Sequence, residues 1–325
     1  TGSAGFIGSY VVQELINRGY DVLGIDNFND YYDPQLKKDR IQNLSVRTNN
    51  FKNIEADIHD EHLVNSVFKN FKPDFVVHLA AQAGVGYSRD NPQAYIRTNI
   101  LGFVNIFEAC KKFNVQNIIY ASSSSVYANN KKVPFSEADH VDNPVSIYAA
   151  TKKTNELLAN VYSDMYKLNT VGLRFFTVYG PWGRPDMAIF KFTDAIFRNK
   201  PIQIFNNGNH FRDFTFINDI KYGIFLVFDN MLKKSNALTN KINFNNEIYN
   251  IGNSNPVNLL DLINLLENII GKKSIREYHE LQKGDVLKTY ADISKIKNKF
   301  NYTPSINIKD GLETFVNWYK DYYKL

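Results

Sequence analysis

Tyr148 and Lys152 stand four positions apart in a stretch with helical periodicity, downstream of a run of serines at 122–125. Side chains at positions i and i+4 of a helix share one face, so the Lys152 ammonium can lie beside the Tyr148 phenol. A nearby positive charge lowers the pKa of a phenol from about 10 towards neutrality. The spacing therefore predicts a tyrosine that can act as a base near neutral pH.

Removal of a hydride from a secondary alcohol needs a base for the hydroxyl proton, a group that tunes the base and a donor that holds the oxygen. Tyr148, Lys152 and one of the serines can supply these three roles. A Tyr and a Lys at this spacing also occur by chance on exposed helix faces. The apolar stretch that ends in the serine run favours the catalytic interpretation.

Glycines at positions 2, 5 and 8 precede a helical pattern at the start of the chain. Such a turn lets the backbone approach a pyrophosphate closely, at a helix N-terminus that stabilises its charge, although the motif could mark only a turn. Asp26 ends the next apolar strand, where an acid accepts hydrogen bonds from ribose hydroxyls and repels a ribose phosphate. We therefore predict NAD rather than NADP. Asp57, after the following strand, could meet the adenine edge or could cap a helix.

Apolar runs alternate with helical patterns through the first half of the chain. The expected strands are Val22–Asp26, Asn53–Asp57, Phe75–Leu79, Asn117–Ser122 and Thr170–Phe175. The expected helices are Gly8–Arg18, His62–Phe71, Ala94–Phe113 and Ser146–Lys167. This alternation predicts an α/β fold in which helices cover both faces of a parallel sheet. Prolines and Asn-rich loops interrupt the later sequence, so we expect a cofactor domain over 1–175 and a smaller domain mainly over 176–325.

The composition excludes several classes of protein. The net charge of +5 is scattered over 325 residues without a block of like charges, so no nucleic-acid partner is expected. No apolar run reaches the ~20 residues of a membrane span. The single Cys110 cannot form an internal disulfide, which indicates a reducing, cytoplasmic location. His78 lacks neighbouring ligand residues, so we expect no metal site. Because Thr1 lies inside the glycine motif, we expect a few residues before it.

The whole chain resembles the extended short-chain dehydrogenases/reductases of the nucleotide-sugar epimerase and dehydratase group. The matching pieces are Thr1–Gly8, His78–Ala81, Ala121–Tyr127, Tyr148 with Lys152, and Arg212–Phe214 with Asp219. This resemblance implies a Rossmann-type doubly wound parallel sheet and a smaller α/β substrate domain, with some later segments returning to the first domain. It also implies that Ser123 is the catalytic hydroxyl residue and that Ser124 and Ser125 line the sugar pocket.

Two segments, Asp26–Asp33 and Arg174–Ala188, resemble UDP-glucuronate 4-epimerases in particular. The resemblance implies NAD-dependent C4 epimerisation of a UDP-hexuronate, UDP-glucuronate to UDP-galacturonate, through a 4-keto intermediate. It implies that Arg184 meets the hexuronate carboxylate. An Arg held between a glycine and a proline suits bidentate capture of a planar carboxylate, although an ordinary surface Arg is the alternative.

The resemblance implies further contacts. The NAD contacts would be Gly2, Gly5, Phe6, Ile7, Gly8, Asp26, Asn27, Asp57, Ile58, Leu79, Ala80, Ala81, Tyr148 and Lys152, with Phe176 and Val178 near the nicotinamide. The UDP-sugar contacts would be Thr177, Arg212 and Asp285, with residues 203–205 beside the uracil. Arg212 and Asp213 could instead form a surface ion pair. Family members pair through helices at Thr98–Lys112 and Thr151–Lys167, so we expect a homodimer, although an intramolecular core would explain the same apolar content.

Two positions depart from the pattern of the uronate epimerases. Gly86 stands where those enzymes commonly carry an Arg, for which Arg89 could compensate, and Ala128 replaces a glycine. The alternatives are therefore epimerisation of a neutral or N-acetylated UDP-hexose, 4,6-dehydration, decarboxylation, or an NAD-binding protein without activity. Dehydration needs an acid pair beside the catalytic hydroxyl, where this chain has Ser124 and Ser125. The presence of all three catalytic residues argues against an inactive protein.

Overall fold

The computed structural model describes residues 1–45, 49–127, 130–236, 246–281 and 286–325. The chain divides into two compact units. The first comprises Thr1–Ala128, His140–Arg174 and Lys221–Tyr249, and the second comprises Asn129–Asp139, Phe175–Ile220 and Asn250–Leu325. Within the described residues, no helix combines the length and the apolar character that crossing a membrane requires.

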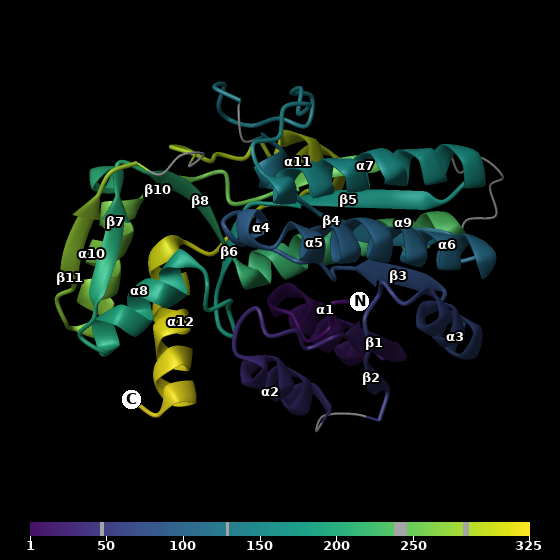
Figure 1. Ribbon diagram of the computed structural model, residues 1–325, viewed down its shortest axis with the longest axis horizontal. Helices are drawn as coiled ribbons and strands as arrows, with labels where there is room; N and C mark the ends of the chain where they lie inside the picture. The colour runs from purple at the N-terminus through teal and green to yellow at the C-terminus, as the bar shows by residue number, and fades with distance from the viewer. Residues whose placement is uncertain (46–48, 128–129, 237–245, 282–285) are drawn as a thin grey trace. The chain divides into compact units, whose positions relative to one another are not determined.

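The first unit is built on parallel strands (Figure 1). Its strands are β1 (Val22–Asp26), β2 (Phe51–Glu55), β3 (Phe75–His78), β4 (Asn117–Ser123), β5 (Asn169–Phe175) and β9 (Glu247–Ile251). β1 pairs in parallel with β2. β3 pairs in parallel with β4, and these two strands belong to a sheet of order β3-β4-β5-β9. Thr1 and Gly2 lie between β1 and β3, because the Gly2 N–H donates to the Ile25 carbonyl (2.7 Å) and the Leu79 N–H to that of Thr1 (3.2 Å). The predicted α/β fold with a parallel sheet is confirmed.

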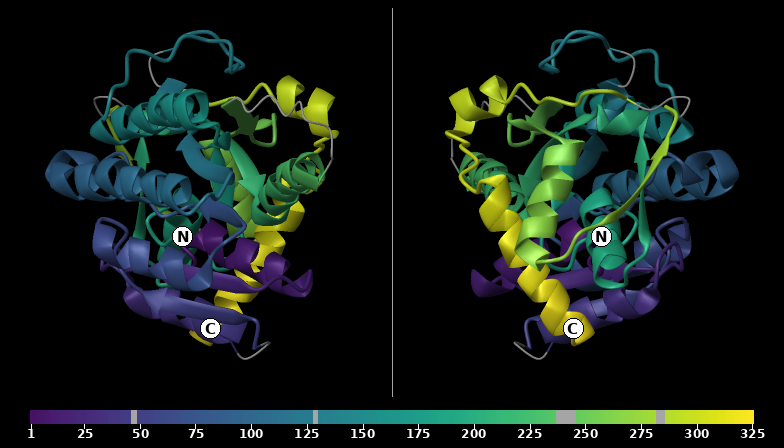
Figure 2. Two further views of the ribbon diagram at one scale, coloured as in Figure 1. Left: turned by 90° about the vertical axis from the view of Figure 1, so that its right-hand side faces the viewer. Right: turned by 90° about the vertical axis from the view of Figure 1, so that its left-hand side faces the viewer.

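Helices pack on these strands. They are α1 (Phe6–Asn17), α2 (Pro34–Ser45), α3 (Glu61–Phe71), α4 (Tyr87–Asp90), α5 (Pro92–Tyr95), the π-helix η1 (Ile96–Gly102), α6 (Phe103–Lys112), the 3₁₀ turn η2 (Ser124–Tyr127), α7 (Ile147–Tyr166) and α9 (Ile217–Asn236). The core joins Phe103 and Phe107 of α6 to Tyr120 of β4 and Tyr162 of α7. Figure 2 shows α6 in blue beside α7 in teal. This packing fixes α7 against the end of β4.

The second unit has two small sheets. Its strands are β6 (Thr177–Tyr179), β7 (Pro201–Phe205), β8 (Phe211–Phe216), β10 (Pro256–Asn258) and β11 (Ile275–His279), and its helical segments are α8 (Ala188–Phe197), η3 (Asn206–Gly208), α10 (Leu259–Ile270), α11 (Ser294–Phe300) and α12 (Ile308–Tyr323). The sheets have the orders β10-β8-β6 and β11-β7. α10 contacts both α8 and α12, and Phe190 of α8 packs on Phe315 and Tyr319 of α12.

Candidate active site

The glycine turn is closely packed against the end of β3. Gly2 has a φ of +72°, and a Cβ atom there would lie 2.6 Å from the Ala80 nitrogen. A Cβ atom on Gly8 would lie 1.9 Å from the Gly2 carbonyl oxygen. Only glycine at position 8 therefore lets the first turn of α1 close onto the backbone at Gly2. The N-cap of α1, Gly5, has no side chain to satisfy the helix N–H groups, an arrangement that suits a pyrophosphate.

Acidic side chains lie at the ends of the neighbouring strands. Asp26 is 9% exposed, and its carboxylate accepts hydrogen bonds from the Ala4 N–H (3.1 Å) and the Phe28 N–H (3.0 Å). The Asn27 amide donates to Asp57 (2.9 Å). Burial alone would raise the pKa of the Asp57 carboxyl, but hydrogen bonds from Asn27 and the His59 N–H hold this pKa below its usual value. The N-cap of α3 is Asp60, so capping does not account for Asp57.

Two buried basic residues of α2 bond to the glycine turn or to the loop after β1, and neither was predicted from the sequence. Arg40 is 1% exposed, and its guanidinium donates to the Ala4 carbonyl (2.9 Å) and the Tyr32 hydroxyl (2.7 Å). Lys37 donates to the carbonyl (2.8 Å) and the side chain (2.7 Å) of Asn29. Arg40 thus joins the loop after β1 to the glycine turn, and Lys37 holds the same loop against α2. Their spacing of three on one helix face was the available signal.

The serine run and α7 supply the predicted catalytic residues. Ser123 ends β4, and its Oγ accepts from the Ser125 N–H (3.1 Å) and donates to the Ser125 hydroxyl (3.1 Å). Lys152 is buried and donates to the Ala121 carbonyl (3.1 Å). Burial lowers the pKa of the Lys152 ammonium to about 8, and the Glu156 carboxylate opposes this shift. Tyr148 lies one helical turn before Lys152, and its ring meets Tyr95 edge-on with 6.0 Å between centroids.

A buried ion pair lies one helical turn beyond Lys152. The Arg174 guanidinium binds Glu156 through Nε and Nη2 (both 2.7 Å), and Nη1 donates to the Tyr127 hydroxyl (2.7 Å). The Ser122 hydroxyl donates to the same Glu156 carboxylate (2.6 Å). The two charged side chains are 3% and 2% exposed. They connect α7 to β4, β5 and η2, so the pair fixes α7 relative to the serine run.

Asn99 makes a second connection to α7, from the π-helix η1. Its side-chain oxygen accepts from the Gln82 N–H (2.8 Å), and its amide donates to the Thr151 hydroxyl (3.0 Å). The Asn155 amide donates to the Asn99 carbonyl (2.6 Å). A π-turn often marks a functional position. Here it joins the loop after β3 to the helix that carries Tyr148 and Lys152.

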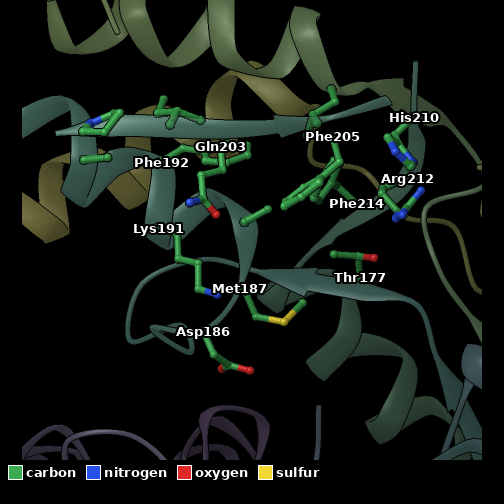
Figure 3. Close-up of a pocket in the computed structure, with 15 residues that line it drawn as sticks. Thr177, Asp186, Met187, Lys191, Phe192, Gln203, Phe205, His210, Arg212 and Phe214 are labelled. Carbon is green, nitrogen blue, oxygen red and sulfur yellow. The ribbon is translucent and has the colours of Figure 1, made fainter. Parts of the chain in front are cut away.

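The second unit contains a cavity of about 580 Å³ (Figure 3). It is lined by Thr177, Asp186, Met187, Ala188, Lys191, Phe192, Ala195, Pro201, Ile202, Gln203, Phe205, His210, Arg212, Phe214 and Leu259. The structure thus brings the predicted Thr177, Gln203, Phe205 and Arg212 together around one space. Asp213 is fully buried and accepts backbone hydrogen bonds from Asn253, Ser254 and Ala291. A surface ion pair between Arg212 and Asp213 is therefore excluded.

The remaining predicted site residues differ in burial and in their contacts. Phe176 and Val178 are buried in the second unit, and Arg184 forms an ion pair with Asp186. Gly86 is exposed in the first unit, with a right-handed helical backbone (φ −61°, ψ −54°). Asp285 and Ala128 lie outside the described residues. Among the residues that the structure describes, no group of three or more His, Cys, Asp or Glu side chains is arranged to hold a metal ion.

Comparisons with known proteins agree with this geometry. Residues 1–252 match the NAD dependent epimerase/dehydratase family. UDP-glucuronate 4-epimerase 2 of Arabidopsis thaliana is 48% identical over 330 residues, which cover 100% of this chain and 76% of the plant protein. The structure of UDP-glucuronic acid 4-epimerase from Bacillus cereus, in complex with UDP-glucuronic acid and NAD, is similar with a TM-score of 0.88 and 35% identity, covering 99% of this chain and 98% of that one.

A UDP-glucose 4-epimerase from Thermotoga maritima, solved with UDP-glucose, has a TM-score of 0.86 and 29% identity, over 99% of this chain and 98% of that chain. The likeness thus extends over both units of the present chain and includes enzymes with acidic and with neutral sugars. The glycine turn, the acidic strand ends and the Tyr–Lys helix all lie within the matched residues 1–252. The chain belongs to the NAD-dependent epimerase/dehydratase family.

Proposed function

We propose that this protein is an NAD-dependent UDP-glucuronate 4-epimerase that interconverts UDP-glucuronate and UDP-galacturonate. The observation that carries the choice of an acidic sugar is Arg184, whose half-buried guanidinium already binds a carboxylate, that of Asp186 at the cavity wall. Relatives that bear the name UDP-glucuronate 4-epimerase, at 48% identity over the whole chain, support the same choice.

The residues of the chain fit the cofactor and the first chemical step. NAD would supply the acceptor for the hydride from C4 of the sugar, and the hydride would return to the opposite face once the 4-keto sugar had turned over in the site. Tyr148 takes the proton from the 4-hydroxyl, and Ser123 donates a hydrogen bond to the same oxygen. Lys152, protonated below its pKa of about 8, stabilises the Tyr148 phenolate. The glycine turn, Asp26 at the end of β1 and Asp57 after β2 would hold the dinucleotide.

The cavity of the second unit suits the nucleotide half of the substrate. Arg212 offers several donors and a permanent charge to a diphosphate. Lys191 adds a second positive charge, and Phe205 and Gln203 offer a ring face and an amide to a base (Figure 3). We assign Thr177, Ser124 and Ser125 to the sugar. A simple experiment separates an epimerase from an inert binder: UDP-glucuronate should raise the NADH absorbance of the purified protein, whereas an inert binder gives no change.

Arg184→Ala should change both affinity and product. A 4-keto glucuronate is a β-keto acid, which loses carbon dioxide when its carboxylate bond aligns with the carbonyl π system. A bidentate guanidinium can resist that alignment. We expect KM for UDP-glucuronate to rise about tenfold and part of the product to be decarboxylated. Initial rates and mass spectrometry of the products test this. An unchanged KM together with an unchanged product would remove the carboxylate role of Arg184.

Gly86→Arg should strengthen binding of the acidic sugar. The position is exposed, its backbone is one that any residue adopts, and a Cβ atom there meets nothing within 4 Å. The free energy of unfolding of the variant should therefore lie within about 0.5 kcal/mol of that of the parent. Restoring the charge common in uronate epimerases should lower KM for UDP-glucuronate about threefold. Gly86→Leu, which adds volume without charge, is the matched control. An equal effect from both variants would contradict a role for charge.

Gly86 also supports a second candidate function, that of a 4-epimerase of neutral or N-acetylated UDP-hexoses. The Thermotoga maritima relative is named for UDP-glucose, and Gly86 removes one positive contact expected for a uronate. Turnover of UDP-glucose or UDP-N-acetylglucosamine at a higher kcat/KM than UDP-glucuronate would favour this candidate. The proposed pairing of Arg184 with a carboxylate favours the uronate.

We propose that the enzyme is a homodimer that pairs through α7 and the η1–α6 helix. Leu157, Val161 and Met165 form an exposed apolar stripe on α7, with 56%, 47% and 62% exposure. Ile96 and Leu101 of η1 are each 47% exposed. An apolar stripe of this kind is typical of an interaction surface. The exposure of these side chains means that the intramolecular core does not account for them.

Light scattering at micromolar concentration should give twice the 37.4 kDa mass of the chain. Val161→Asp should yield the monomer, because a charge would lie unpaired in a buried interface. Glu313→Gln, an exposed charge change on α12 rather than on α7 or the η1–α6 helix, is the control and should leave the dimer intact. A monomer mass for the parent protein would overturn this surface as a dimer interface.

A further inference from the structure

Arg184 is bound by a carboxylate of its own loop. Its Nε donates to Oδ1 of Asp186 (3.0 Å) and its Nη2 donates to Oδ2 (2.5 Å). The two side chains are 23% and 21% exposed. Two parallel N–H···O bonds to a planar carboxylate are the same contacts that Arg184 would offer to the carboxylate of a hexuronate. Asp186 therefore reproduces, within the chain, the group that the proposed substrate would present.

The backbone that carries this pair is held in place. Trp182 has a φ of +61°, which is unusual for a bulky residue, and its ring packs on Trp318 and Tyr322 of α12 with centroids 5.4 and 5.2 Å apart. The Gly183 N–H donates to the Gly180 carbonyl (3.0 Å), and Met187 N–H to that of Arg184 (3.2 Å). Backbone hydrogen bonds thus fix the loop on both sides of Arg184 and Asp186. Replacement of Asp186 by a substrate carboxylate on Arg184 therefore requires movement of the side chains only.

Asp186 also lines the cavity, on the same side as Met187 and Lys191 (Figure 3). A carboxylate that enters this end of the cavity meets a like charge before it gains the Nε and Nη2 donors of Arg184. A neutral sugar meets no such competition, because it brings no carboxylate that must displace Asp186 from Arg184.

We propose that Asp186 is a built-in competitor for the substrate carboxylate and that its displacement from Arg184 sets the preference of the site between acidic and neutral sugars. The proposal rests on the proposed function. Asp186 lowers the affinity for a hexuronate and leaves the affinity for a neutral UDP-hexose nearly unchanged. The pair is partly exposed, so the competition is modest and corresponds to a factor of about five in affinity.

The test compares Asp186→Asn with the parent in the NAD-loaded enzyme. KM is measured for UDP-glucuronate, and Ki is measured for UDP-glucose as an inhibitor. We expect KM for UDP-glucuronate to fall about fivefold with kcat unchanged, and Ki for UDP-glucose to stay within about twofold. If the pair serves only to hold the loop in shape, Asp186→Asn should instead raise both KM for UDP-glucuronate and Ki for UDP-glucose. Glu313→Gln removes an equal charge from an exposed ion pair of α12 that does not line the cavity, and it should change neither constant.

A double-mutant cycle with Arg184→Ala isolates the exchange. In the Arg184→Ala background, Asp186→Asn should no longer lower KM, because no guanidinium remains for the two carboxylates to share. A fall in KM that persists in this background would mean simple repulsion and would overturn the exchange. Equal KM values for Asp186→Asn and the parent would also overturn it. Failure of the parent to convert UDP-glucuronate would instead overturn the proposed function, so the two failures are distinct.

Discussion

Tyr148→Phe should lower kcat for epimerisation about a thousandfold, because the variant loses the group that removes the 4-hydroxyl proton. Phe keeps the ring and its edge-on contact with Tyr95, at 6.0 Å between centroids. The fold should therefore persist, and binding of NAD and of UDP-glucuronate should change little. The measurement is the initial rate at saturating substrate, with bound NAD quantified on the same sample.

Tyr166→Phe is the matched control, because Tyr166 lies near the end of the same helix and is 40% exposed. It should retain the parent rate within about twofold. If Tyr148→Phe kept more than about a tenth of the parent kcat, proton transfer would not depend on this phenol.

Glu156→Gln should have the largest effect on stability. The change leaves the Arg174 guanidinium, 3% exposed, without its ion-pair partner. Removing one member of a buried pair costs about 3–5 kcal/mol, because the other charge stays buried and uncompensated. We expect urea unfolding to register a loss of that size. The double variant Glu156→Leu with Arg174→Met removes both charges and should recover most of the lost stability. An unfolding free energy equal to that of the parent would contradict the account of this network.

The same variant should also shift the pH dependence of catalysis. The Lys152 pKa is lowered to about 8 by burial, and the Glu156 charge opposes that shift. Without Glu156 the pKa of Lys152 falls further, so the ammonium that assists Tyr148 is lost at a lower pH. The alkaline limb of the kcat/KM profile should therefore move to lower pH, whereas Tyr166→Phe should leave it in place. An alkaline limb that stays in place would exclude coupling between the two residues.

The parts of the site that depend on local spacing could be predicted from the sequence. The glycines at 2, 5 and 8 and the Tyr148–Lys152 pair each act within a few residues, and their requirements for packing and for a common face are visible in the sequence. The alternation of apolar runs predicted the parallel sheet, which the structure confirms. These patterns are imposed by the period of the helix and the strand.

Long-range partners could not be predicted in this way. Residues 94–113 were expected to form one helix, but the structure has α5, the π-helix η1 and α6 there. The π-turn contains Asn99, which forms hydrogen bonds with Gln82 and Thr151. The hydrophobic periodicity of the sequence carries no information about contacts between such distant residues. Arg174 offered a clearer signal that was overlooked. A charge within an apolar, fully buried strand requires a partner, although the sequence does not identify it as Glu156.

The central claim is tested most directly by incubating the NAD-loaded protein with UDP-glucuronate and resolving the products by chromatography and mass spectrometry. We expect UDP-galacturonate at unchanged mass, formed until the two epimers reach equilibrium. A product lighter by carbon dioxide would identify a decarboxylase. No conversion of UDP-glucuronate, combined with epimerisation of UDP-glucose or UDP-N-acetylglucosamine, would contradict the assignment of Arg184 to a substrate carboxylate.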